Sequence, residues 1–350
     1  MVPTQQTALL LPEKFGDWTV GSVDVPTPGP GQLLVKIEAT ALNPVDWKIQ
    51  VYGMFIENFP SIVGFDAAGT VDAIGKGVEG FAVGDKVVYQ GFFVNPQATF
   101  QQYGIANADV TAKIPGNITV DEAATIPLGL ATAALGLFDL YAAGSAKLFP
   151  PWVEGGRGKY AGKAIVIFGG ASSVGQYTIQ LAKLAGFSSI ITTASLKNTE
   201  LLESFGATHV LDRTLSEAAL VAEVAKIVPA VEVVYDAISI ASTQNPAYDI
   251  VAPGGTLVLV LPDQIDATKK SAASGKQIVN VSGNVNIPDR RKTGQTLYSK
   301  LTALLEEGAI KPNRVELLPN GLAGIPEGLE RMKKDQVSAV KLVAQPQETV

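Results

Sequence analysis

The sequence predicts a two-domain α/β protein, in which a doubly wound parallel sheet is joined to a β-rich, barrel-like unit. Its 350 residues exceed the roughly 150–200 residues of one typical domain. Apolar runs and helical patterns alternate over residues 163–286, whereas short apolar runs separated by turns fill residues 1–125. A cleft between two such domains is the expected place for a ligand.

Residues 1 to about 125 have the pattern of antiparallel strands. The apolar runs TALLL, LLVKIEATAL, GTVDAIG and GFAVGDKVVY are separated by turn signals such as PTPGPG at 26–31. The pattern changes near Asp121, a candidate N-cap that precedes EAATIPLGLATAALGLFDLYAA. We therefore expect a helix to lead into the second domain, followed by a loop at 149–163, where prolines and glycines cluster.

The following region alternates between continuous apolar runs and amphipathic segments. The expected strands are AIVIFG, IITTAS, HVLDR, EVVYDAI, TLVLVL and QIVNVSG, and helices are expected through VGQYTIQLAKLAG, LKNTELLESFG and LSEAALVAEVAKIV. Continuous apolar strands are typical of a parallel sheet that helices cover on both faces. A helix at 294–307 and the strands RVELLP and VSAVKLVA follow, and we expect this tail to fold back onto the N-terminal unit. The predicted domains are 126–289 for the doubly wound unit and 1–125, completed by 290–350, for the β-rich unit.

Composition favours a small-molecule partner. The chain carries 27 lysines and arginines against 33 acidic residues, a formal net charge of -6, and it has no basic run. This argues against nucleic acid or an anionic membrane as the main partner. No apolar stretch has the length of a membrane-spanning helix, and the first residues lack a signal-peptide pattern, so a cytoplasmic location is expected.

The absence of cysteine restricts the chemistry. With no cysteine and one histidine, His209, the chain cannot form disulfides, use a thiolate or ligate zinc through cysteine. No metal site is therefore expected. His209 lies in GATHV, which leads into a strand, and a structural role is expected for it.

A glycine- and serine-rich turn predicts a dinucleotide site. In AIVIFGGASSVGQYTIQLAKLAG, small residues stand between a buried strand and a helix, where a pyrophosphate can approach the backbone and the helix N-terminus. Ser172 stands where the pattern G-x-G-x-x-G has its second glycine. The alternative is a purely structural turn. The expected contacts are Gly169, Gly170, Ala171, Ser172, Ser173, Val174 and Gly175.

The end of the second strand indicates NADPH rather than NADH. Enzymes that use NAD usually place an acidic residue there, but SSIITTASLKNT contains none before Glu200. Ser195 and Lys197 instead offer a hydroxyl donor and a cation for a 2'-phosphate. The alternative roles are a helix N-cap for Ser195 and a solvated side chain for Lys197. Arg213 and Leu261 complete the expected cofactor-binding set.

Six motifs in order carry a resemblance that covers nearly the whole chain. They are NPVDWK at 43–48, GFDAAGTV at 64–71, GFAVGDKVV at 80–88, AATIPLGLATAALGL at 123–137, GGASSVG at 169–175 and VSAVKLV at 337–343. In these motifs the chain resembles the zinc-independent medium-chain dehydrogenase/reductase superfamily, particularly its quinone oxidoreductases and fungal trans-acting enoyl reductases. The resemblance implies a Rossmann domain and a GroES-like barrel domain.

The same resemblance bears on metal and reaction. Zinc alcohol dehydrogenases have a cysteine at the place of Asn43 and a G-H-E motif at the place of Gly64, Phe65 and Asp66, so neither ligand is kept here. The resemblance implies hydride transfer from a nicotinamide to the β-carbon of an α,β-unsaturated carbonyl. A quinone or carbonyl reductase, or an NADPH-binding protein without turnover, remains the alternative.

The relatives' pattern points to four candidate catalytic residues, which are Asn43, Asp46, Tyr52 and Thr132. A hydrogen-bond or proton donor to the developing enolate would assist the reduction, and Tyr52 is one candidate. Asn43 before Pro44 could equally be a turn residue, and Asp46 could bind nearby backbone N–H groups.

Two features concern substrate and assembly. The aromatic stretch GFFVNPQATFQQYG at 91–104 favours an apolar partner, such as an enone, a quinone or an acyl thioester, although a core hairpin would also explain it. The apolar strand QIVNVSG could pair with its copy in a homodimer or be covered within a monomer.

Overall fold

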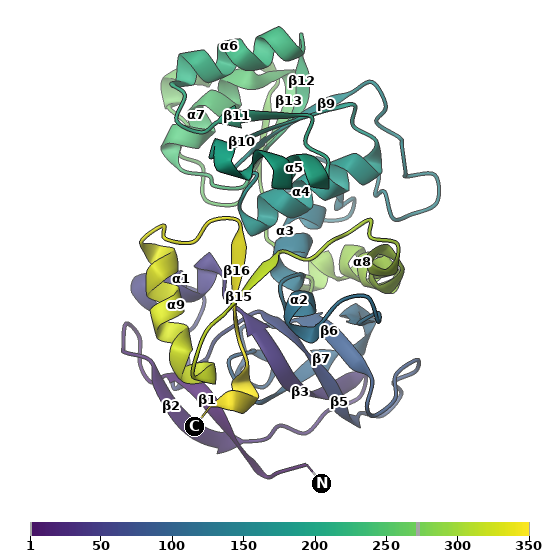
Figure 1. The fold of residues 1–350 in the computed structure, drawn as a ribbon, viewed down its shortest axis with the longest axis vertical. Helices are drawn as coiled ribbons and strands as arrows, with labels where there is room; N and C mark the ends of the chain where they lie inside the picture. The colour runs from purple at the N-terminus through teal and green to yellow at the C-terminus, as the bar shows by residue number, and fades with distance from the viewer. Residues whose placement is uncertain (1, 271–273, 350) are drawn as a thin grey trace. The chain divides into compact units, whose positions relative to one another are not determined.

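A computed structural model of the chain describes residues 2–270 and 274–349. The chain forms two compact units (Figure 1). Unit 1 comprises Met1–Leu128, Tyr298–Gly308 and Pro312–Val350, and unit 2 comprises Gly129–Leu297 and Ala309–Lys311. Within the described ranges, no helix is both long and apolar enough to cross a membrane.

Unit 1 is the β-rich unit, and it contains two sheets. The larger, mixed sheet has the order β15-β16-β3-β5-β6-β8, and β7 pairs with β3 outside this path. Its strands are β3 (Gln32–Ala41), β5 (Asp66–Ile74), β6 (Lys86–Gln90), β7 (Tyr103–Asn107), β8 (Thr111–Lys113), β15 (Arg314–Leu317) and β16 (Val340–Ala344). The smaller sheet joins β2 (Thr19–Asp24), β1 (Gln5–Leu11) and β4 (Ser61–Ile62).

The C-terminal tail completes the larger sheet. Val343 and Ala344 of β16 pair antiparallel with Ala41 and Thr40 of β3. The expectation that the tail folds back onto the N-terminal unit is thereby confirmed. This pairing matters for the site because β16 carries Lys341 into the interior, where only 4% of its surface is exposed.

One helix interrupts the region that was expected to contain only strands. Helix α1 (Pro44–Tyr52) begins after Asn43, has proline in its first turn and ends at Gly53, whose φ is 60°. Proline at the first position and a left-handed glycine after the last are ordinary helix boundaries. The all-β prediction was wrong here, because the apolar runs on both sides concealed a short helix. Helix α1 packs beside α9 (Ile325–Lys333) (Figure 1).

The predicted helical entry is divided in two. Helix α2 (Val120–Ala124) is capped by Thr119, and helix α3 (Pro127–Phe138) begins three residues after α2 ends. Pro127 disfavours helical geometry at the residue before it, which explains the break. Helix α3 begins in unit 1 and continues in unit 2, and α8 (Pro288–Glu306) also crosses the division.

Unit 2 is a doubly wound Rossmann domain with a parallel sheet. The strand order β11-β10-β9-β12-β13-β14 corresponds to the order 3-2-1-4-5-6 of dinucleotide-binding domains. The strands are β9 (Ala164–Phe168), β10 (Ser189–Ala194), β11 (His209–Asp212), β12 (Val231–Asp236), β13 (Val251–Leu259) and β14 (Gln277–Asn280). Strand β14 occupies one edge of the sheet.

Helices lie on both faces of this sheet in the part of the chain that the structure describes. They are α4 (Ser173–Ala185), α5 (Thr199–Phe205), α6 (Glu217–Ile227) and α7 (Ala241–Ile250), with α4 and α5 on one face and α6 and α7 on the other (Figure 1). The sequence patterns indicated α4, α5 and α6 but not α7. Helix α7 contains Pro246 and several polar residues, which weaken the helical pattern. The fold class predicted from the sequence, a Rossmann domain plus a GroES-like barrel, is confirmed.

Candidate functional site

The glycine turn of unit 2 is packed so closely that side chains cannot enter it. Gly169 follows β9 with φ of 75°, a conformation that favours glycine. A Cβ atom on Gly175 would lie 2.2 Å from the carbonyl oxygen of Gly169. A Cβ atom on Gly170 would lie equally close, at 2.2 Å, to Oγ1 of Thr192. The small residues therefore bring strand β9, the turn and helix α4 into direct backbone contact.

The first turn of α4 presents donors for an anion. Ser172 is the N-cap, and its Oγ accepts a hydrogen bond from the N–H of Gly175 at 3.0 Å. The backbone N–H groups of Ala171 and Val174 donate to no acceptor within the described part of the chain. Ser173 does have a partner. A helix of 13 residues with donors at its N-terminus suits a phosphate group.

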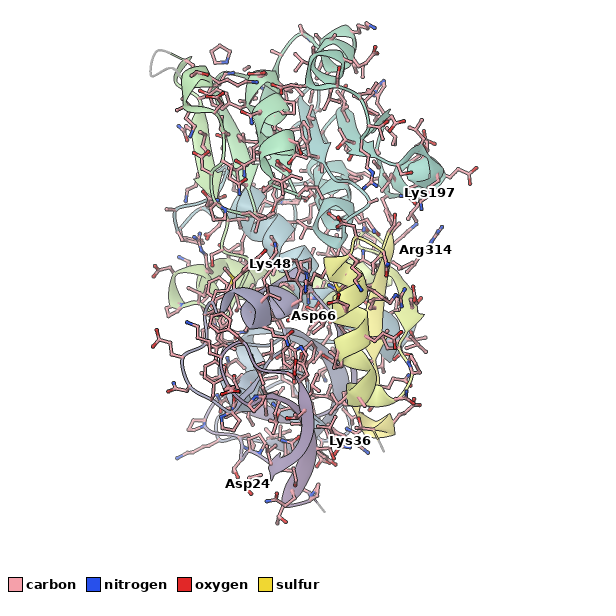
Figure 2. The ribbon with its side chains drawn as sticks, turned by 90° about the vertical axis from the view of Figure 1, so that its left-hand side faces the viewer. Asp24, Lys36, Lys48, Asp66, Lys197 and Arg314 are labelled. Atoms are coloured by element: carbon pink, nitrogen blue, oxygen red, sulfur yellow. The ribbon has the colours of Figure 1, made fainter. Side chains whose placement is uncertain are left out.

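The ends of β10 and β11 bring three polar candidates to one edge of the sheet. Ala194 pairs in parallel with Asp212, and the N–H of Arg213 donates to the carbonyl of Ala194 at 3.0 Å. Ser195 and Arg213 therefore follow neighbouring strand ends. Ser195 caps a short 3-10 turn without using its side chain. Lys197 is exposed, and Figure 2 places it at the surface of unit 2.

An acidic residue also lies at this edge. The Asp212 carboxylate accepts hydrogen bonds from the backbone and the hydroxyl of Thr214, at 2.9 and 2.8 Å, and these bonds lower its pKa. It is therefore already engaged in its own turn. Leu261, the remaining candidate, lies beyond β13, and its carbonyl accepts from the Asn280 side chain.

The sequence analysis missed Ile238, which covers the glycine turn. A Cβ atom on Gly169 would meet Cγ1 of Ile238 at 2.4 Å. Ile238 is 36% exposed and precedes Ser239, a buried residue with φ of 56°. Asp236 holds this turn by accepting from the N–H groups of Ile238 and Ser239. Its position after β12 was predictable, because β12 neighbours β9 in a Rossmann sheet.

Two of the four catalytic candidates lie in a buried polar cluster of unit 1. The Asp46 Oδ2 atom accepts the backbone N–H of Asn43 at 2.6 Å, across the first turn of α1. The Asn43 side chain donates through Nδ2 to Oδ2 of Asp66 at 2.8 Å. Asn43 and Asp46 are 2% and 0% exposed. The sequence-based alternative, that Asp46 binds a nearby backbone N–H group, is what the structure contains.

Lys341 brings a positive charge to this cluster. Its Nζ lies 3.0 Å from Oδ2 of Asp66 and also donates to Oδ1 of Asn43. The side chains of Lys341 and Asp66 are 4% and 0% exposed, so this is a buried ion pair. We call Asn43, Asp46, Asp66 and Lys341 the polar cluster. The sequence analysis did not assign roles to Asp66 and Lys341, although both stand inside motifs that carry the resemblance.

Asp46 favours its protonated form. Burial raises its pKa well above the usual range, and the negative charge of Asp66 adds to this effect, whereas the N–H of Asn43 and the charge of Lys341 oppose it. The Oδ1 atom of Asp46 is buried and has no hydrogen-bond partner among the described residues. An ionised carboxylate with one unpaired buried oxygen would be costly, which acts in the same direction as the raised pKa of Asp46.

The two other candidates lie elsewhere. Tyr52 ends α1 and is 58% exposed, with its ring 5.8 Å from the ring of Trp47. Thr132 lies on α3 in unit 2, is 9% exposed, and its carbonyl accepts from the hydroxyl of Tyr235 at 2.9 Å. The structure thus unites Asn43 with Asp46 and places Tyr52 at the opposite end of their helix.

Lys48 also lies among the candidate residues, although no sequence pattern singled it out. It lies on α1 between Asp46 and Tyr52, is half-buried, and burial lowers its pKa (Figure 2). Its ammonium lies 5.5 Å from the ring of Trp47 and forms no hydrogen bond or ion pair within the described ranges. A desolvated lysine without a carboxylate partner is a candidate donor. The signal was present, because Lys48 closes the NPVDWK motif.

Aromatic side chains gather near the end of α1. The Phe93 ring lies 4.8 Å from that of Phe65, 5.3 Å from that of Phe55 and 5.4 Å from that of Phe92. Phe55 is 62% exposed, whereas Phe100 of the stretch 91–104 is fully buried. The buried Phe100 agrees with the core alternative for residues 91–104, and the apolar-substrate alternative stays a prediction. His209 is exposed at the start of β11 and contacts the hydroxyl of Thr208.

Comparisons with known proteins agree with this architecture. Residues 29–143 match the family described as "Alcohol dehydrogenase GroES-like domain", and residues 173–279 match that described as "Zinc-binding dehydrogenase". The chain is 30% identical to the "Trans-enoyl reductase grgB" of Penicillium sp over 362 residues, covering 98% of each chain. It is 32% identical to the "Dehydrogenase orsE" of Emericella nidulans over 371 residues, covering 98% of this chain and 99% of the relative.

A solved structure shares the fold over nearly the whole length. The alcohol dehydrogenase superfamily protein from Novosphingobium aromaticivorans superposes with a TM-score of 0.78 at 26% identity, covering 96% of this chain and 99% of that one. The similarities extend over both units. The two relatives named above are 30% and 32% identical to this chain over nearly their full length. The chain belongs to the medium-chain dehydrogenase/reductase superfamily, and over its full length it is similar to a protein named as a trans-enoyl reductase.

Proposed function

We propose that this protein is an NADPH-dependent reductase that saturates the double bond of an α,β-unsaturated carbonyl compound without a catalytic metal. The observation that carries the proposal is the full-length similarity to a trans-enoyl reductase, which covers 98% of both chains. The geometry of unit 2 and the polar residues of α1 support it independently.

The residues of unit 2 fit a dinucleotide. The turn from Gly169 to Gly175 packs backbone against backbone, and the N–H groups of Ala171 and Val174 are available to bind a pyrophosphate. Ile238 would contribute an apolar wall. Ser195, Lys197 and Arg213 lie at the adjacent strand ends, where a 2'-phosphate would need a hydroxyl and cations. This arrangement favours NADPH over NADH.

The chain must supply a hydrogen-bond donor and a proton to complete the reduction. NADPH, when bound, supplies a hydride for the β-carbon, and the α-carbon then takes a proton from a donor on the protein or from water. Lys48 is the best-suited donor on α1, because its ammonium is half-buried and has no competing carboxylate. Tyr52 and Thr132 remain the further candidates for binding the carbonyl oxygen.

The polar cluster favours a metal-free reaction. Asn43 stands at the place of a zinc-binding cysteine, and its side chain is occupied by Asp66 and Lys341. The ammonium of Lys341 would repel a metal cation at this position. Metal-independent activity is therefore part of the proposal.

The aromatic side chains indicate the class of substrate. Phe55 and Tyr52 are exposed near the end of α1, and Met54 between them is 36% exposed. Apolar side chains that remain exposed in one place commonly mark a ligand or partner surface. We therefore propose an apolar enone or an acyl thioester as substrate, and a quinone as the alternative acceptor.

A titration tests the proposal directly. NADPH and NADH are titrated into purified protein treated with a chelator, and cofactor fluorescence is followed; absorbance decay is then recorded with enone, acyl thioester, quinone and aldehyde panels. We expect tight NADPH binding and enone reduction that survives chelation. Turnover of quinones alone would favour the quinone reductase. Binding without turnover would favour an NADPH-binding protein, and no binding of either nucleotide would refute the proposal.

A further inference from the structure

Asp66 receives donors from three different parts of unit 1. Its Oδ2 accepts from Nδ2 of Asn43 at 2.8 Å and pairs with Nζ of Lys341 at 3.0 Å. Its Oδ1 accepts the backbone N–H of Leu128 at 2.6 Å. Asn43 is the N-cap of α1, Leu128 is in the first turn of α3, and Lys341 lies on β16. Residues 43, 66, 128 and 341 are thus joined by one carboxylate.

Groups of positive charge surround the Asp66 carboxylate. The first turn of α3 donates a backbone N–H to it, and helix N-termini carry partial positive charge. Lys341 supplies a full positive charge inside the core, where an isolated carboxylate would be unstable. Asp46 faces it from α1 and favours the protonated form, and Tyr298 faces it from α8 with a buried hydroxyl. Asp66 and Lys341 therefore form the ion pair of the polar cluster.

The helices that Asp66 holds are those that carry candidate catalytic groups. Helix α1 bears Lys48 and Tyr52, which follow the Asn43 cap by five and nine positions. Helix α3 bears Thr132, which follows Leu128 by four positions, about one helical turn. A shift in either first turn would move these side chains along with the helix.

We infer that Asp66 is a positioning residue, whose carboxylate holds the first turns of α1 and α3, and that Lys341 is its required counter-charge. The expected effect on catalysis rests on the proposed function, whereas the expected effect on the first turns of α1 and α3 does not. Asp66 and Lys341 do not themselves act on the substrate. They orient Lys48, Tyr52 and Thr132 by fixing the starts of two helices. The C-terminal strand β16 is thereby an obligatory part of the site.

The test uses the double variant Asp66→Asn/Lys341→Met, which removes both charges together and avoids an unpaired buried charge. We expect cooperative unfolding, unchanged NADPH affinity, and a kcat lowered on the order of 100-fold, as for misplaced catalytic groups. Hydrogen exchange of the α1 peptide at 43–52 should be faster, while exchange in β9 stays the same. Lys341→Arg keeps the charge and should retain more activity than Lys341→Met.

The control and the outcomes separate two questions. Lys86→Met/Glu38→Gln removes a solvent-exposed ion pair of the same sheet and should leave kcat and exchange unchanged. Unchanged exchange at 43–52 in the Asp66/Lys341 double variant would overturn the inference, as would a kcat equal to that of the wild type. If that variant does not fold, the hydrogen exchange of residues 43–52 is compared between Lys341→Arg and Lys341→Met instead. A wild-type protein that reduces no enone refutes the proposed function, while the exchange result still decides the positioning of α1.

Discussion

The glycine turn of unit 2 is built from closely packed backbone groups, whereas the polar cluster of unit 1 is built from buried polar and charged side chains. In the turn, Gly169 and Gly175 approach each other so closely that no Cβ atom fits. In the cluster, Asp66 has a donor on each oxygen and is completely buried. The turn offers backbone N–H donors, whereas the polar cluster contains the buried Asp66 carboxylate with its own partners.

This difference teaches what each site can tolerate. A site made of backbone N–H groups is sensitive to added volume but insensitive to the chemistry of nearby side chains. A buried ion pair is sensitive to the loss of one charge, because the remaining charge is left without a partner. The predictions below use these sensitivities, starting with the largest expected effect.

The first prediction concerns the proton donor on α1. Lys48→Met should lower kcat on the order of 100-fold or more, the usual cost of losing a general acid, with NADPH affinity unchanged. Tyr52→Phe is the matched comparison on the same helix and should cost less, since Tyr52 is 58% exposed. A larger loss for Tyr52→Phe would transfer the role of donor to the tyrosine.

The pH profile sharpens this prediction. Burial lowers the pKa of Lys48, and the group donates only in its protonated form. Activity should therefore decrease as pH rises through the lowered pKa, at a lower pH than for an ordinary lysine. Lys48→Arg keeps its charge at high pH and should remove this decrease. A steady-state profile of kcat in both proteins measures the difference, and identical alkaline limbs would argue against Lys48.

The second prediction adds volume to the nucleotide turn. Gly175→Ala places a methyl group 2.2 Å from the Gly169 carbonyl oxygen, and only backbone atoms can move to relieve the contact. We expect a loss of about 3 kcal/mol of stability, the upper part of the range for overpacking, together with weaker NADPH binding. Thermal unfolding and cofactor fluorescence measure both effects.

A glycine in open surroundings serves as the control. Gly116→Ala adds the same methyl group at an exposed position where nothing lies within 4 Å. It should change neither stability nor NADPH affinity. Equal effects at Gly116 and Gly175 would show that the packing of the turn is not responsible.

The third prediction concerns the choice of cofactor. Replacing Ser195 and Lys197 by alanine together should weaken NADPH binding by about 2–3 kcal/mol while leaving NADH nearly unchanged, because charge-assisted hydrogen bonds to the 2'-phosphate are lost. Arg213→Ala is the comparison at the neighbouring strand end. Parallel titrations with both nucleotides measure the selectivity, and equal losses for both would contradict a role in phosphate binding.

The smallest effect is expected at Asp46. Burial raises its pKa in the folded protein, so the folded state retains this proton above the pH at which the unfolded chain releases it. The contribution of Asp46 to stability is therefore present below its unfolded pKa and decreases as pH rises toward its folded pKa. Asp46→Asn resembles the protonated acid and should raise the unfolding temperature at neutral pH by roughly 2–4 °C.

Comparing the two proteins at several pH values checks the sign of this effect. The gain from Asp46→Asn should become larger from pH 4 to pH 8 and vanish in acid. A variant that is less stable than the wild type at pH 7 would indicate that Asp46 is ionised in the folded protein.

The unit 2 site was largely predictable from residue order. Its strand, turn and helix are contiguous between residues 164 and 185, and the local need for small residues appears directly in GGASSVG. Ser195 and Lys197 follow the next strand, so the rule for parallel sheets located them. The sequence patterns also indicated most strands, because buried parallel strands appear as continuous apolar runs.

Local patterns were less informative where tertiary contacts decide the structure. The sequence patterns did not predict α1, because strand-like runs stand on both sides of it. They did not predict α7, because Pro246 and its polar residues weaken the helical pattern. Asp66 and Lys341 stand in motifs of the chain, but nothing in their spacing shows that they form an ion pair. Their partnership depends on β16 returning to pair with β3 across some 300 residues of sequence.

The order of residues was sufficient for the fold class and the glycine turn, and composition was sufficient to exclude cysteine ligands, because each depends on neighbours in the chain or on residue type alone. The tertiary structure alone decided that Asn43 and Asp46 are buried, that Lys48 is half-desolvated, and that Asp66 joins two helices and a strand. Burial and charge pairing depend on what packs against a side chain. Those neighbours come from distant parts of the sequence, so no local pattern can contain them.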